Sequence, residues 1–174
     1  ADITCTNSSS TTILAPAGAP DAPVLSLTQP TCTVGTGAIT LSPMAGMEYK
    51  LDNGAWGAYP SGGWSGLTPG SHTVYIRRIS DPTCTNSTTE VIDEAPIVPS
   101  GIITDVDQPT CTVPTGRIEF LTPVGALGDY MYSIGNGYQT SPVFENVAPS
   151  KTYPLSVQSK DGCITAAGEA IIDD

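Results

Sequence analysis

Apolar and polar residues alternate along many short segments of this chain, and a period of two predicts β-strands. The clearest early examples run over 24–28 and 38–42, where apolar residues alternate with Ser or Thr. The segments expected to form strands are 24–28, 38–42, 49–51, 73–76 and 91–92, followed by 102–106, 117–121, 130–134, 153–157 and 170–171. No window of eleven or more residues has the 3.6-residue period of an amphipathic helix, so we expect an all-β protein.

Turn-forming residues separate these segments at short intervals. Gly (18 residues) and Pro (16 residues) interrupt the chain too often to leave room for a long helix. Asn53-Gly54 and Asn136-Gly137 follow predicted strands. Because both residue types tolerate positive φ, Asn-Gly predicts a tight hairpin at each position.

An internal repeat determines the predicted domain organisation. The six-residue segment 29–34 recurs without change as 108–113, which is an offset of 79 in the numbering. Cys5, Cys84 and Cys163 are spaced by the same interval. The chain therefore has a repeat period of 79, and every cysteine falls on it.

The repeat divides the chain into one partial and two whole units. Residues 1–20 match only the end of a unit, so we expect them to be the last strand and linker of a preceding repeat. Residues 21–95 and 96–174 are expected to be complete repeats. Six or seven short strands in each favour tandem small β-sandwiches of immunoglobulin or fibronectin type. Linkers rich in Pro and Ala over 15–23 and 95–99 favour an extended rod.

The cysteines indicate disulfides and not metal or thiol chemistry. The chain has no Cys-x-x-Cys motif and a single histidine, so zinc-site spacing is absent. Pairing Cys32 with Cys84 and Cys111 with Cys163 gives the same separation in the numbering in each unit, and we expect these two bonds. Closing a loop of that length contributes roughly 4 kcal/mol in the chain-entropy model. Cys5 would then be unpaired, with its partner in an upstream repeat.

Two other pairings also respect the period and stay open. One joins Cys5 to Cys32 and Cys84 to Cys111. The other joins Cys32 to Cys163 and connects two domains. In a simple sandwich, the loop before the second strand and the loop before the last strand lie at opposite ends. That geometry counts against the pairing within units unless the segment that carries Cys32 folds back.

Charge narrows the range of partners. The chain has 6 Lys and Arg against 17 Asp and Glu, a formal net charge of −11. Phosphate backbones and anionic lipid headgroups repel such a chain, so we expect no nucleic acid as a partner. No apolar run approaches the roughly 18 residues of a membrane span. No signal peptide is recognisable, because the chain begins in the middle of the repeat pattern.

Three aromatic residues are the candidate ligand-binding set. Trp56, Tyr59 and Trp64 lie close together in a segment rich in Gly and Ser, where exposed rings could stack on a sugar. Trp64, however, aligns with Phe144 at a position that should face the core. We therefore expect core or hairpin packing, with sugar binding as the alternative.

The acidic turn residues are candidates for calcium binding. Asp52 stands in a turn, and Asp105 and Asp107 stand near the start of the second repeat. Oxygen-rich loops between tandem extracellular domains can hold calcium. None of the three has an acidic residue at the equivalent position of the other repeat, so we expect no metal and no cofactor, with calcium as the alternative. His72 likewise has no recurring nucleophile or base, and we do not expect an enzyme.

The recurring motifs resemble those of a known family. Gln-Pro-Thr-Cys, Thr-Gly-x-Ile, Tyr-x-Leu/Ile-x-Asn-Gly, an aromatic residue, Leu-x-Pro-Gly, Thr-Val-Tyr-Ile and Asp-Gly-Cys are similar to the repeats of giant Bacteroidetes surface adhesins, of which the SprB-type gliding-motility adhesins are an example. The first repeat departs from the pattern at residues 81–84 (Asp-Pro-Thr-Cys), and the second at 149–150 (Pro-Ser).

This resemblance implies a location and a role. Such repeats form long filaments on the outer cell surface, are exported by type IX secretion and are moved by the gliding machinery. The chain would be a disulfide-stapled spacer in adhesion or gliding motility, with neighbouring repeats as partners and surface polysaccharide or other filaments as further ones. The alternatives are a carbohydrate-binding module and a non-catalytic appendage of a secreted enzyme.

Overall fold

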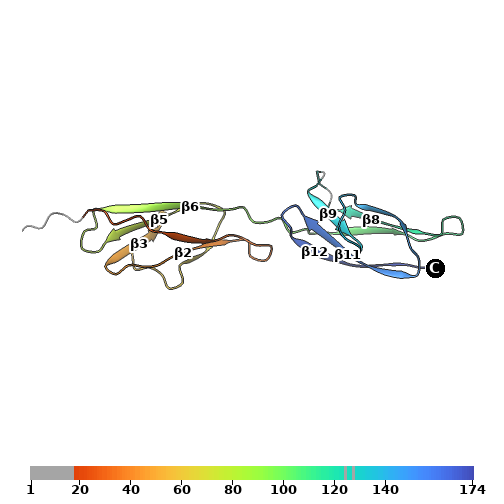
Figure 1. Ribbon diagram of the computed structural model, residues 1–174, viewed down its shortest axis with the longest axis horizontal. Helices are drawn as coiled ribbons and strands as arrows, with labels where there is room; N and C mark the ends of the chain where they lie inside the picture. The colour runs from red at the N-terminus through yellow and green to blue at the C-terminus, as the bar shows by residue number, and fades with distance from the viewer. Residues whose placement is uncertain (1–17, 124, 127) are drawn as a thin grey trace, which may run out of the picture. The chain divides into compact units, whose positions relative to one another are not determined.

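The computed structural model describes residues 18–123, 125–126 and 128–174. Within these residues the chain forms twelve β-strands and no helix, and the strand pairings given for them are antiparallel (Figure 1). The all-β prediction is therefore confirmed. The strands fall into two compact units, each with six strands in two three-stranded sheets.

The first unit contains the strands from β1 to β6. Their bounds are β1 (Leu25–Thr28), β2 (Gly37–Leu41), β3 (Met47–Leu51), β4 (Trp64–Leu67), β5 (Gly70–Arg78) and β6 (Thr85–Ile92). One sheet has the order β1-β2-β4 and the other has the order β3-β5-β6. The consecutive strands β1 and β2 pair directly, as do β5 and β6. The connections β2–β3, β3–β4 and β4–β5 cross from one sheet to the other.

The second unit repeats this topology. Its strands are β7 (Ile103–Asp107), β8 (Gly116–Thr122), β9 (Tyr130–Ser133), β10 (Val143–Val147), β11 (Lys151–Ser159) and β12 (Ile164–Ile172). The sheets have the orders β10-β8-β7 and β12-β11-β9, which correspond strand for strand to those of the first unit. Two sequences that differ at most positions thus reach one strand arrangement.

Each unit buries one core that receives side chains from both of its sheets. In the first unit the central residues are Ile39 and Leu67 from one sheet and Val74 and Ile92 from the other. Successive strand residues point to opposite faces, so the alternation in the sequence supplies one apolar face per strand. Two sheets that share a core are compatible with a small β-sandwich.

The core of the second unit is larger and more aromatic. Phe120 on β8 contacts Tyr132 on β9 with ring centroids 5.2 Å apart, and also contacts Phe144. Ile118, Val157 and Ile172 are completely buried in the same cluster. At the position equivalent to Phe120 the first unit has Leu41, which helps to explain its smaller core.

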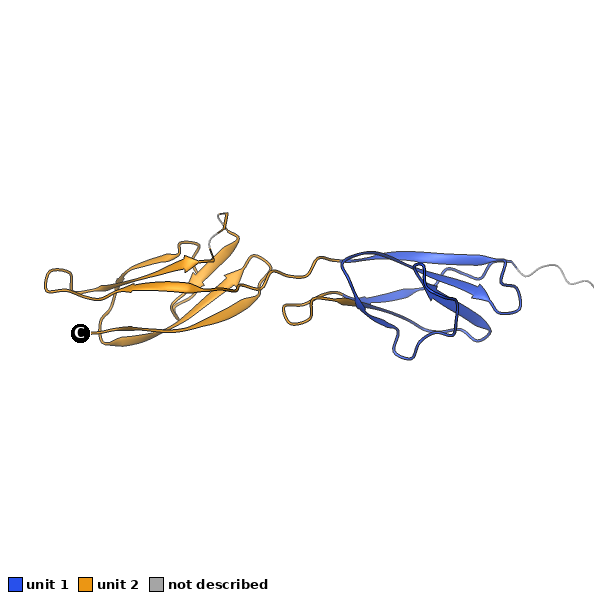
Figure 2. Ribbon diagram, turned by 180° about the vertical axis from the view of Figure 1, so that it is seen from behind, with its two compact units in different colours: residues 1–28, 38–92 blue, residues 29–37, 93–174 orange. Residues whose placement is uncertain are grey.

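The boundaries of the compact units differ from the repeat boundaries. Unit 1 comprises Ala1–Thr28 and Ala38–Ile92, and unit 2 comprises Gln29–Gly37 and Asp93–Asp174 (Figure 2). The segment Gln29–Gly37, which connects β1 to β2, therefore belongs to the second unit although its sequence belongs to the first repeat. Most of the expected partial repeat at 1–20 lies outside the described residues.

The two Asn-Gly sites do not form the expected tight hairpins. Positive φ falls on Asp52 in the first turn (48°), and on Gly135 and Gly137 in the second. The chain does turn back, since Tyr49 forms an isolated antiparallel bridge with Gly57. It then crosses to the other sheet, where β4 pairs with β2 and not with β3. Because the connection from β3 leads to a strand of the other sheet, it does not need a two-residue hairpin loop.

Neighbouring residues on β6 offer a test of the core assignment. Ile92 is 1% exposed and Val91 is 52% exposed. We expect Ile92→Ala to lower the free energy of unfolding of the first unit by about 2–5 kcal/mol, because it leaves a cavity. The matched change Val91→Ala should stay within about 0.5 kcal/mol. Both tryptophans of the chain lie in the first unit, so urea unfolding followed by tryptophan fluorescence reports this unit alone. Equal losses for the two variants would contradict the assignment.

Candidate functional site

One disulfide joins the two repeats of the sequence. Cys32, in the segment between β1 and β2, is bonded to Cys163, which stands just before β12. The Cα atoms are 5.5 Å apart and the two residues are separated by 131 positions. Cys84 is a half-buried free thiol and Cys111 is an exposed one.

The pairing expected within each repeat is therefore wrong. Cys84 lies directly before β6 in the first unit, whereas the segment that carries Cys32 belongs to the second unit. This separation corresponds to the opposite placement of the two loops that argued against a bond between Cys32 and Cys84. The pairing of Cys32 with Cys163, one of the two alternatives, is the one in the structure. Cys5 lies outside the described residues.

The bonded and the free loop share two internal hydrogen bonds. The backbone N–H of Thr31 donates to the carbonyl of Val34 at 2.8 Å, and that of Thr110 donates to the carbonyl of Val113 at 2.8 Å. The Thr31 hydroxyl accepts the Val34 N–H at 3.2 Å, and the Thr110 hydroxyl accepts the Val113 N–H at 3.1 Å. The repeated Thr-Cys-Thr-Val sequence thus builds one loop conformation, whether or not its cysteine is bonded.

A glutamine side chain holds the base of each loop. The Gln108 side-chain oxygen accepts the N–H of Asp173 at 2.9 Å, and its amide nitrogen donates to the carbonyl of Ile171 at 2.9 Å. The Gln29 oxygen accepts the N–H of Asp93 at 2.9 Å in the same manner. The Gln-Pro-Thr-Cys motif therefore combines a fixed base with a cysteine at the tip.

The three sequence-predicted aromatic residues do not form one set. Tyr59 and Trp64 contact each other edge to face, with ring centroids 5.3 Å apart, and Tyr59 also contacts Tyr49. The Tyr59 hydroxyl accepts the backbone N–H of Leu41 at 3.0 Å. Trp64 packs against the core of the first unit, as its alignment with Phe144 indicates. These two rings contribute to the packing of β2, β3 and β4.

Trp56 lies apart from them, on the outer face of the sheet β3-β5-β6. The Arg77 guanidinium stands over its ring at 4.2 Å from the centroid, and the Lys50 ammonium at 5.4 Å. Lys50 also lies over Tyr75, and Arg77 is paired with Glu48 at 2.7 Å. Such cation–π contacts occupy the faces that a sugar ring would need.

A hollow of about 440 Å³ lies beside Trp64, lined also by Ala58 and Pro60. Neither Trp56 nor Tyr59 lines it. The three predicted aromatic residues therefore do not line one hollow together. Sugar binding by these residues stays a prediction with little geometric support.

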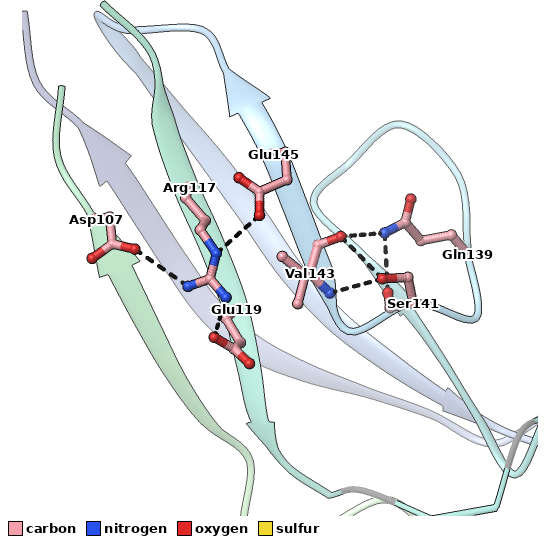
Figure 3. Close-up of polar contacts among 7 residues, drawn as sticks. All are labelled: Asp107, Arg117, Glu119, Gln139, Ser141, Val143 and Glu145. Atoms are coloured by element: carbon pink, nitrogen blue, oxygen red, sulfur yellow. Dashed lines mark hydrogen bonds and ion pairs between the residues drawn. The ribbon is translucent and has the colours of Figure 1, made fainter. Parts of the chain in front are cut away.

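The second unit has an ion-pair network on its sheet β10-β8-β7 (Figure 3). The Arg117 guanidinium on β8 is paired with Asp107 on β7 at 3.2 Å, with Glu145 on β10 at 3.1 Å, and with Glu119 on its own strand. These bonds raise the pKa of Arg117, Glu119 being the main cause. The network crosses all three strands of the sheet and has no counterpart in the first unit, where Ala38 stands at the position of Arg117.

His72 takes part in a polar contact at the start of β5 in the first unit. Its Nδ1 lies 2.8 Å from an Asp52 carboxylate oxygen and its Nε2 lies 2.8 Å from the carbonyl of Thr68. The other Asp52 oxygen accepts the N–H of Thr73 at 2.7 Å. Because both ring nitrogens face acceptors, the doubly protonated ring is favoured. The Thr68 carbonyl is the main cause of the raised pKa of His72, and Asp52 adds to it. No nucleophile is among these partners.

In the second unit, all three residues of this contact are different. Gly135, Tyr153 and Pro154 stand where the first unit has Asp52, His72 and Thr73, as the pairing of β9 with β11 and of β3 with β5 indicates. The Tyr153 hydroxyl donates to the carbonyl of Ala148 at 2.8 Å, as His72 does to the equivalent carbonyl of Thr68. Proline has no N–H that would need the missing carboxylate.

The acidic residues do not assemble into a metal site in the described part of the chain. No group of three or more His, Cys, Asp or Glu side chains there could hold a metal ion. Asp52 is engaged with His72 and Thr73, and Asp107 with Arg117. Among the described residues, Asp52 and Asp107 are thus held by polar partners of the protein itself.

Comparison with known proteins identifies no relative, since no protein-family model matches the chain and no curated protein is detectably similar to it. In the residues that the structure describes, no helix is long and apolar enough to span a membrane. The recurring residues with reactive side chains are the cysteines, one in the loop before the second strand of each repeat and one before its last strand.

The His72 contact predicts a pH dependence of the first unit. A pKa raised above the unfolded value of 6.5 means that the stabilising contribution is complete below that pH and is lost as the pH rises through the folded-state pKa. The free energy of unfolding, measured by tryptophan fluorescence in urea, should fall as the pH rises from 6 to 8.

The variant His72→Gln should abolish this slope, and Asp52→Asn should reduce it while keeping an acceptor for the Thr73 N–H. If His72→Gln keeps the slope of the parent chain, another group is responsible and the assignment is wrong.

Proposed function

We propose that this chain is a structural segment of a long extracellular repeat protein, a disulfide-stapled spacer in a surface filament that serves adhesion or gliding motility. The observation that carries the proposal is the bond between Cys32 and Cys163, because it ties one sequence repeat to the next. A spacer needs mechanical continuity along the chain more than it needs a binding pocket. The role is non-enzymatic.

The strand order supports an immunoglobulin- or fibronectin-like identity for each unit. Immunoglobulin constant-type domains have strands A, B, E and D in one sheet and C, F and G in the other. The orders β1-β2-β4 and β3-β5-β6 correspond to A-B-E and C-F-G without strand D. Domains of this kind occur widely as tandem modules of cell-surface proteins. We infer that the Pro- and Ala-rich residues at 95–99 are a stiff linker and that the parent protein is an extended rod.

The disulfide also supports an extracellular location. Disulfides persist in secreted and surface proteins, whereas cytosolic thiols are kept reduced. Closing 131 residues contributes about 5 kcal/mol in the chain-entropy model when both units unfold together. That is a large part of the total stability of a typical domain.

The charge supports a segment that stays dispersed and does not bind anionic surfaces. A net charge of −11 makes parallel copies repel one another and disfavours contact with lipid headgroups. Neighbouring repeats of the same chain are the proposed partners, with surface polysaccharide or other filaments as additional ones. The motif resemblance to bacterial gliding adhesins points in the same direction.

Removing the disulfide should destabilise the chain strongly. The double variant Cys32→Ser/Cys163→Ser should lower the Tm by roughly 10–20 °C, because the unfolded chain gains conformational freedom. The matched double variant Cys84→Ser/Cys111→Ser should change the Tm little, and its Tm should still fall in reductant. Melting followed by circular dichroism measures both. An unchanged Tm in the first variant would contradict the stapling role.

Surface exposure tests the cellular role. An antibody raised against residues 21–174 should label intact cells of the source organism without permeabilisation, and mild protease treatment should remove the label. The same antibody should reduce attachment or gliding if the segment belongs to an adhesive filament. Labelling only after permeabilisation would rule out the surface proposal, and labelling without any effect on attachment or movement would rule out the adhesive role.

A further inference from the structure

The two free thiols stand at the repeat positions of the two bonded cysteines. Cys111 lies one repeat period after Cys32, and Cys84 lies one period before Cys163. The bonded pair therefore consists of the loop cysteine of one repeat and the cysteine before the last strand of the following repeat. Applied to the free thiols, the same rule gives each of them a partner in an adjacent repeat.

We propose that Cys111 and Cys84 are the two halves of a repeating inter-repeat disulfide. Cys111 bonds the position before the last strand in a repeat that follows, and Cys84 bonds the loop of a repeat that precedes. In a solution of this chain alone, a second copy supplies both partners, and the link runs head to tail. This proposal concerns covalent assembly and does not depend on an adhesive role.

The free loop is already in the conformation of the bonded loop. Thr110 and Val113 form the same two hydrogen bonds as Thr31 and Val34. The backbone bond is 2.8 Å in both loops, and the bond to the threonine hydroxyl is 3.1 Å in the free loop and 3.2 Å in the bonded one. Gln108 fixes the base of the free loop to the end of β12. Little conformational freedom remains to be lost when Cys111 bonds a partner, which favours association.

Differences in burial correspond to one occupied and one open site. Cys163 is 1% exposed and Pro30, in the loop bonded to it, is also buried. At the equivalent free positions, Cys84 and Pro109 are only half-buried. The loop cysteines do not differ in this way, since Cys111 and the bonded Cys32 are both exposed. Contact with a partner would cover Cys84 and Pro109 as Cys163 and Pro30 are covered.

The turns before Cys84 and before Cys163 are held by different hydrogen bonds. The Cys84 thiol remains half-buried. The Asp81 carboxylate accepts the hydroxyl of Thr83 at 2.6 Å and its N–H at 3.3 Å, which fixes the turn. In the second unit, Ser159 instead donates its N–H to the carbonyl of Cys163 at 2.9 Å. Both turns end with the cysteine directly before the last strand of the unit.

Bond formation needs an oxidant, and a small disulfide such as oxidised glutathione supplies one. The Cys111 thiolate attacks a glutathione sulfur, which breaks the glutathione disulfide and releases one glutathione thiolate. The Cys84 thiolate of a second copy then attacks the Cys111 sulfur and releases the other. Two protein thiols are oxidised, one glutathione disulfide is reduced to two glutathione molecules, and these take up the two thiol protons.

Oxidation of the purified chain tests the proposal. The variant Cys5→Ser leaves Cys84 and Cys111 as the only free thiols beside the intact disulfide. In a glutathione redox buffer at high protein concentration it should form a ladder of covalent oligomers on a non-reducing gel. Peptide mapping of the excised oligomers should find Cys84 linked to Cys111. Adding Cys84→Ser or Cys111→Ser should abolish every band above the dimer.

Several results would overturn the proposal. Random collision would place Cys84 with Cys111 in only about half of the links, so a share no higher than that of the urea-unfolded control counts against it. Three further results would contradict it. They are a Cys84–Cys111 bond in the monomer band, links mainly between identical cysteines, and glutathione adducts without oligomers. None of these results bears on surface exposure, so this proposal and the adhesive role fail separately.

Discussion

The bond between Cys32 and Cys163 is the constraint on which the covalent organisation of this chain depends. It fastens the connection between β1 and β2 to the turn before β12, so that the segment Gln29–Gly37 becomes part of the second compact unit. The core cluster of the first unit has four buried residues, whereas that of the second unit is larger. The disulfide stabilises the fold by restricting the unfolded chain, and this contribution does not depend on how large the core is.

Strand positions were predictable because a period of two and frequent Gly and Pro leave a sequence few alternatives. Cysteine pairing was not, because the periodic spacing fits a bond within a repeat and a bond between repeats equally well. The deciding fact is which compact unit contains residues 29–37, and hydrophobic alternation does not encode it. The opposite placement of the two loops in a sandwich counted against the bond between Cys32 and Cys84, but it did not choose between the two alternative pairings.

Polar contacts were missed for a related reason. The Arg117 network joins residues of three strands, and its partners become neighbours only once the sheet order is known. Only Glu119, two positions along the same strand, lies on the same face by sequence alone. His72 and Asp52 were considered separately as a base and a metal ligand, whereas in the fold they satisfy each other. A functional role inferred from residue type alone is least reliable for a strand residue, because a neighbour on the next strand can pair with its side chain.

The comparison of the two units separates what the fold requires from what it tolerates. The backbone carbonyl at Thr68 and at Ala148 receives a donor in both, from His72 in one and from Tyr153 in the other. The requirement is a satisfied carbonyl beside the first residues of a central strand, and the identity of the donor is free. The cysteine loops behave differently, since the six residues, two internal hydrogen bonds and the spacing all recur, even in the loop whose cysteine has no partner. A loop maintained in full without its bond is best explained by a bond that forms with the next repeat.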